Sequence, residues 1–123
     1  WPVEGKIIQS FNPSKRQNGL TFRAKPGARV VAGTAGLVVY VGDTIRGYGH
    51  LILIKHSRSL ISAYAGDQHV IRKIGETIHR GETIAYVMQQ KVPKVHFELR
   101  VDGKPKNPLL YLAVKPEKGN KKK

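Results

Sequence analysis

Lys94-Val95-His96-Phe97-Glu98-Leu99-Arg100-Val101 is the stretch that decides the fold of this 123-residue chain. Polar and apolar residues alternate along it, which is the pattern of a β-strand. Lys94 and His96 therefore share one face of the strand. A catalytic zinc site needs about three protein ligands and an open fourth position. The Lys94 ammonium group beside His96 would repel such a cation, so this strand is poorly suited to bind a metal ion.

Short runs rich in β-branched residues accompany this strand, and glycine or proline turns bound most of them. No window of about 11 residues keeps a helical period. The candidate strands are residues 37–41, 51–55, 61–65, 70–74 and 83–88. The sequence therefore predicts a mostly β fold with two packed antiparallel sheets. A small repeat, Gly75 to Ile78 followed by Gly81 to Ile84, is expected to form two successive glycine turns.

The composition indicates one globular domain with a strongly basic surface. Hydrophobic residues make up 40% of the chain and charged residues 24%, and the formal net charge is +14. Residues 115–123 hold five Lys and one Glu, so we expect residues 1–114 to form the domain and residues 115–123 a flexible basic tail. The absence of cysteine excludes disulfides and thiolate metal sites. No apolar run approaches the roughly 20 residues of a membrane span, so we expect no membrane insertion.

The order of several short motifs resembles the LytM (lysostaphin-type) zinc endopeptidase domain. The resemblance spans nearly the whole chain up to about Leu112 and implies the peptidase fold of that family. The matching stretches are residues 27–32, 36–42, 47–56, 62–65, 95–98 and 107–112.

The resemblance also implies that the metal site has been lost. Gln17 and Thr21 stand where the family has a zinc histidine and a zinc aspartate in the motif His-x-Gly-x-Asp. Gly66 replaces a catalytic histidine, and Lys94 replaces the first histidine of His-x-His. His96 alone survives, and an amide, a hydroxyl and one imidazole make a poor zinc site. We therefore expect no cofactor and no enzymatic activity.

The former active-site groove is the candidate binding surface. Lys94 is its best-supported cation because the motif fixes its position. His96 is equally compatible with a hydrogen-bonding role on the groove floor and with a structural role, and Tyr64 with a groove wall and with core packing. The candidate groove residues are Gln17, Thr21, Arg46, Tyr48, Lys55, Tyr64, Gly66, Lys94, His96 and Glu98.

Family members without metal ligands are associated with activation of N-acetylmuramoyl-L-alanine amidases, which cleave peptidoglycan at cell division. The resemblance thus implies a non-catalytic amidase activator whose groove binds a regulatory helix of the amidase. It also implies a periplasmic or cell-envelope location. Because the chain begins at Trp1, we expect a processed fragment whose preceding region carries any outer-membrane anchor.

Other functions remain open from the sequence. A peptidoglycan-binding module is the main alternative, since the ancestral groove held a peptide crossbridge. A residual zinc endopeptidase and a biotinyl or lipoyl carrier rank lower, and the carrier lacks the expected Met-Lys-Met hairpin because Met88 is the sole methionine. Nucleic-acid binding ranks last because only the charge suggests it, without aromatic platforms or a known motif.

Overall fold

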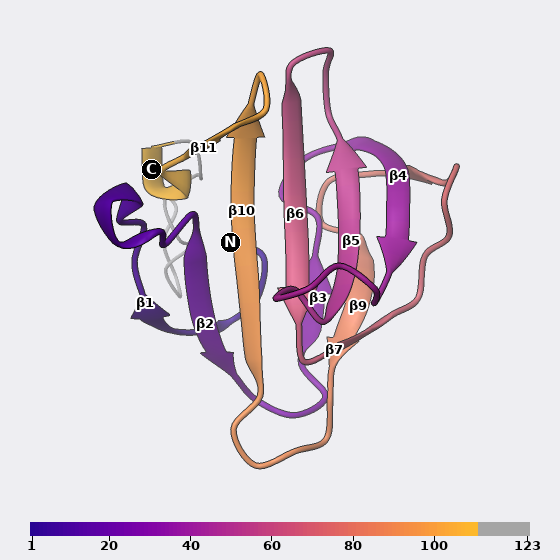
Figure 1. The fold of residues 1–123 in the computed structure, drawn as a ribbon. Coiled ribbons are helices and arrows are strands. Elements are labelled where there is room, and N and C mark those ends of the chain that lie inside the picture. The colour runs from indigo at the N-terminus through magenta and orange to yellow at the C-terminus, as the bar shows by residue number, and fades with distance from the viewer. Residues whose placement is uncertain (111–123) are drawn as a thin grey trace, which may run out of the picture.

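The computed structural model describes residues 1–110 and consists mainly of strands arranged in two antiparallel sheets. The larger sheet has the order β1-β2-β10-β6-β5-β4-β8, and β11 pairs with the C-terminal end of β10 (Figure 1). Its strands are β1 (Gly5–Gln9), β2 (Leu20–Ala24), β4 (Gly36–Gly42), β5 (His50–Lys55), β6 (Leu60–Gly66), β8 (Thr77–Ile78), β10 (Lys94–Val101) and β11 (Lys104–Lys106).

The smaller sheet lies behind the larger one in Figure 1 and has the order β3-β9-β7. Its strands are β3 (Arg29–Val31), β7 (Gln68–Val70) and β9 (Thr83–Val87), and two short 3-10 turns, η1 (Pro13–Lys15) and η2 (Pro108–Leu110), complete the fold. The prediction of a mostly β fold with two packed antiparallel sheets is confirmed. The predicted domain end at residue 114 and the basic tail lie outside the described residues.

Side chains along β10 alternate between the core and the outer face of the large sheet. Val95 and Phe97 point between the sheets and are 0% and 3% exposed. The ring of Phe97 packs against that of Tyr64, with centroids 5.1 Å apart. The intervening residues of β10 must then lie on the outer face of the large sheet. Burial of one face thus fixes the register and presents the other face for function.

The segment 70–74 is not the strand that its β-branched residues predicted. Strand β7 ends at Val70, and Ile71 and Ile74 are exposed. The chain turns instead, because the Glu76 carboxylate accepts a hydrogen bond of 2.6 Å from the Lys73 N–H. The backbone N–H of Glu76 closes the same turn on the Lys73 carbonyl. Local turn chemistry therefore outweighs strand propensity here.

The repeat forms two successive turns with the same bonding pattern, as predicted. In the second copy the Glu82 carboxylate accepts a 2.6 Å bond from the His79 N–H. Each copy ends in an isoleucine, Ile78 or Ile84, that is fully buried between the sheets. Each copy of the repeat thus turns the chain so that its isoleucine packs in the core.

Candidate functional site

The site lies on the outer face of the large sheet, where β10 meets β2. Thr21 of β2 stands directly opposite His96 of β10. The loop between β4 and β5 crosses in front of β5 and β6 (Figure 1). Its Tyr48 reaches Glu98 of β10 through a hydrogen bond of 3.0 Å. Beneath this loop lies a small apolar floor, formed by Leu51, Ala63 and Ala65 with Tyr40, Tyr48 and Leu53 against them.

A closed hydrogen-bond network occupies the centre of the site. His96 Nδ1 lies 3.0 Å from Thr21 Oγ1, and His96 Nε2 lies 2.9 Å from Glu98 Oε2. The Tyr48 hydroxyl donates to Glu98 Oε2 at 3.0 Å. Arg100 donates to Glu98 Oε1 from Nε at 3.0 Å and from Nη2 at 2.8 Å. A carboxylate whose side chain is only 3% exposed is thereby held by three partners.

The environment of Glu98 keeps it ionised. Burial by itself would raise the pKa of this carboxyl, but the hydrogen bonds and charges of His96 and Arg100 hold the pKa below its ordinary value of 4.5. Burial raises the pKa of the Tyr48 phenol, and the neighbouring Glu98 charge raises it further. Tyr48 therefore stays protonated and can serve as the donor.

An open pocket of about 420 Å³ adjoins this network. Gln17, Thr21 and His96, which the motif comparison places at the family's three metal-ligand positions, all line it. The structure thus brings the former ligand positions together although their ligands have changed. The other lining residues are Gln9, Arg16, Asn18, Gly47, Tyr48 and Glu98.

These residues do not fit a catalytic zinc ion. Both ring nitrogens of His96 already have partners within the protein, and the Glu98 carboxylate is occupied by Arg100. Neutral amide and hydroxyl groups stand at the other two positions, whereas zinc takes imidazole, thiolate or carboxylate ligands. Across residues 1–110, no three His, Asp or Glu side chains are grouped so as to hold a metal ion.

Gly66, which stands where the motifs of the family place a catalytic histidine, has an unusual backbone conformation. Gly66 has φ +119°, a conformation that L-residues rarely adopt. A Cβ atom built there would lie 2.5 Å from the Lys94 carbonyl oxygen. A histidine therefore cannot return to this position without movement of β6 or β10.

Four other candidate residues do not line the pocket. Lys94 is exposed on the outer face, two residues from His96 along β10. Lys55 lies exposed at the far end of β5, and Arg46 lies exposed in the loop that carries Tyr48. The structure corrects the groove-wall interpretation of Tyr64, whose side chain is 1% exposed in the core on the opposite face. Tyr64 packs in the core because it lies directly opposite Phe97 and its side chain therefore points to the same face of the sheet.

Sequence reasoning missed Arg100 and four lining residues, which are Gln9, Arg16, Asn18 and Gly47. The signal for Arg100 was present, because it lies two residues after Glu98 and so shares its strand face. Gln9 and Arg16 reach the pocket through the pairing of β1 with β2 and through the turn at η1. Neither placement has a local sequence signal.

Comparison with known proteins agrees with this fold. The model of peptidase family M23 matches residues 15–108, and the chain belongs to this family, which contains the LytM domains. It is 38% identical over 115 residues to the murein hydrolase activator NlpD of Escherichia coli (strain K12), an alignment that covers 91% of this chain and 30% of NlpD. The resemblance inferred from the motifs is therefore confirmed.

Two further similarities complete the comparison. The uncharacterized lipoprotein YgeR of Escherichia coli (strain K12) is 37% identical over 126 residues, which covers 100% of this chain and 49% of YgeR. The crystal structure of a zinc containing peptidase from Vibrio cholerae superposes with a TM-score of 0.76 at 26% identity, over 87% of this chain and 37% of that chain. The chain spans about a third to a half of the length of these relatives.

We expect Arg100→Met to lower the free energy of unfolding by about 2 kcal/mol, because Glu98 loses two charge-assisted hydrogen bonds while His96 and Tyr48 remain. The double variant Glu98→Gln/Arg100→Met should recover part of this loss, because no unpaired charge is left buried. Urea unfolding at pH 7 measures both. Equal stabilities of the parent and Arg100→Met would contradict a structural role for the pair.

The same network predicts a pH dependence. Since the pKa of Glu98 is lowered by folding, its contribution to stability is full above its ordinary pKa of 4.5 and is lost as the pH falls through the lowered value. Glu98→Gln should lack this component in urea unfolding between pH 7 and pH 3. An unchanged pH profile in that variant would show that other carboxylates carry the acid response.

Proposed function

We propose that this domain is a non-catalytic activator of N-acetylmuramoyl-L-alanine amidases and works through the former active-site groove. The observation that supports it most is the pocket itself. Gln17, Thr21 and His96 line it together, and the His96 ring is already hydrogen-bonded to Thr21 on one side and to Glu98 on the other. Such a pocket offers binding without the chemistry of a bound metal.

The names of the relatives support the same function. NlpD is named a murein hydrolase activator, and amidases are one class of murein hydrolase. This chain corresponds to about 30% of NlpD, so transfer of the activator role to this domain is part of the proposal.

Activation follows from groove binding if the amidase has a regulatory helix that blocks its own active site. A groove that binds the displaced helix better than the blocking one shifts the population towards the open amidase. The apolar floor and the polar lining around Tyr48 suit an amphipathic helix laid into a groove. The pocket then acts as a receptor for one segment of the partner.

The experiment that tests this function is release of dye from labelled peptidoglycan by a purified amidase, with and without the domain. We expect the domain to raise the rate of release and to release no dye when added alone. An unchanged amidase rate at saturating domain would reject the activator function. Dye release by the domain alone would indicate a residual endopeptidase.

Absence of a resident zinc is a second expectation, because His96 has no free ring nitrogen and the other ligand types are missing. Elemental analysis of the purified domain should give far less than one zinc per chain. Stoichiometric zinc that is lost in a His96→Ala variant would show that the network opens to bind metal.

We further propose a cell-envelope location, with this domain facing the periplasm. Relatives that carry the name lipoprotein support it, among them YgeR and the outer membrane antigenic lipoprotein B of Haemophilus influenzae. In the described residues, no helix is long and apolar enough to cross a membrane.

A further inference from the structure

Three cations stand side by side on the outer face of the large sheet and form what we call the cationic row. In the strand register, Arg23 of β2 lies directly opposite Lys6 of β1 on one side and Lys94 of β10 on the other. Directly opposite residues point to the same face, so the three side chains form one row across three strands. Neighbouring strands are about 4.8 Å apart, so the row is about 10 Å wide.

The side chains of the cationic row form no ion pair within the part of the chain that the structure describes. All three side chains are exposed, and the four ion pairs between residues 1 and 110 involve none of them. The Asp67 carboxylate beside Lys94 accepts a bond of 2.8 Å from the backbone N–H of Lys94, not from its ammonium group. Glu4, two residues before Lys6, forms no ion pair with it.

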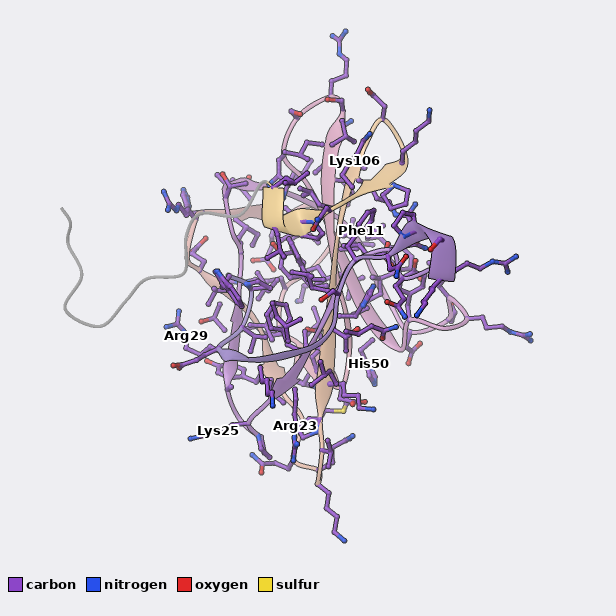
Figure 2. All side chains as sticks on the ribbon, turned by 90° about the vertical axis from the view of Figure 1, so that its left-hand side faces the viewer. Phe11, Arg23, Lys25, Arg29, His50 and Lys106 are labelled. Carbon is purple, nitrogen blue, oxygen red and sulfur yellow. The ribbon has the colours of Figure 1, made fainter. Side chains whose placement is uncertain are left out.

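Like charges directly opposite each other destabilise a sheet. The domain therefore keeps a costly arrangement on an exposed face, with no ion pair to it from residues 1–110. A concentrated positive field of this kind attracts and orients an anionic partner. Figure 2 shows that Arg23 lies near one end of the molecule with Lys25, while Lys106 lies at the opposite end.

The cationic row lies next to the pocket on the same face of the sheet. Arg23 and Lys94 are each two residues from Thr21 and His96, so the row begins about 7 Å from the pocket along the strands. The pocket lining holds one unpaired cation, Arg16, among mostly uncharged groups. An occupant that runs along this face therefore passes from a nearly neutral pocket to a dense positive charge.

We infer that the cationic row binds the acidic end of the partner segment whose other part fills the pocket. This inference rests on the proposed function and deepens it by assigning the charge pattern of the segment. A protein segment fits this asymmetry because its side chains differ from one end to the other. A repeating wall polymer presents the same groups at every step and has no such polarity.

The test compares two triple variants of equal charge. One is Lys6→Gln/Arg23→Gln/Lys94→Gln, which neutralises the cationic row. The matched control is Arg58→Gln/Lys73→Gln/Lys104→Gln, which neutralises three exposed cations elsewhere. Binding of each variant is measured at low salt to a purified amidase, to poly-L-glutamate and to purified peptidoglycan sacculi. The melting temperature of each variant checks folding.

We expect the row variant to bind the amidase and poly-L-glutamate about tenfold more weakly than the control triple variant. This is the combined effect expected from the loss of three exposed ion pairs with the partner. Its affinity should also depend less on salt. Its melting temperature should equal or exceed that of the parent, because repulsion between the strands is removed. Equal binding by the two triple variants would overturn the inference.

Two outcomes separate this inference from the proposed function. If the parent does not bind the amidase but binds poly-L-glutamate through the row, the activator function fails and the preference of the row for an acidic chain stands. If the row variant keeps its affinity for both the amidase and poly-L-glutamate and loses sacculi, the inference fails, and the row is a peptidoglycan contact.

Discussion

Asn18→Trp should abolish amidase activation while the domain stays folded. Asn18 lines the pocket of about 420 Å³ and lies outside the Glu98 network, so an indole at this position fills the groove without removing a structural contact. A partner segment would then lose its central contacts, which are typically worth at least about 2 kcal/mol each, and activation should fall more than about tenfold. The measurement is amidase-dependent dye release over a range of domain concentrations.

Arg58→Trp is the matched control, because it adds the same ring to an exposed turn away from the pocket. It should activate the amidase as the parent does. The melting temperatures of both variants should lie close to that of the parent. Full activation by a folded Asn18→Trp variant would mean that the pocket is not the working surface, and a peptidoglycan-binding function would then be favoured.

Gly66→Ala should strongly destabilise the domain. An L-residue at φ +119° costs about 1–3 kcal/mol. Its Cβ would also lie 2.5 Å from the Lys94 carbonyl oxygen, and relief of such an overlap by backbone movement costs typically 1–3 kcal/mol more. We expect a total loss of about 3 kcal/mol in the free energy of unfolding, measured by urea titration.

Gly75→Ala separates the two contributions. Gly75 has a similar φ of +97°, but nothing lies within 4 Å of the Cβ that alanine would add. It should therefore lose only the conformational part of about 1–3 kcal/mol, without the added cost of the overlap. Equal losses at the two positions would mean that β10 moves freely away from β6. In that case a histidine could be restored at position 66 more easily than the structure indicates.

The sequence was sufficient for the fold class and the family. Alternation in β10 is a local pattern with a period of two, and it correctly separates Val95 and Phe97 in the core from His96 and Glu98 on the outer face. Motif spacing also selected Gln17 and Thr21 as candidate groove residues, and both line the pocket. The segment 70–74 failed because β-propensity is weaker than the turn that Glu76 closes.

Tertiary structure alone decided which residues meet. Thr21 and His96 are 75 residues apart, Tyr48 and Glu98 are 50 apart, and Lys6 and Lys94 join Arg23 from opposite sides. Such neighbours depend on the register of strands that are distant in the sequence, and no local pattern encodes that register. The composition contains the excess of positive charge, but only the sheet gathers three of these charges into one row beside the pocket.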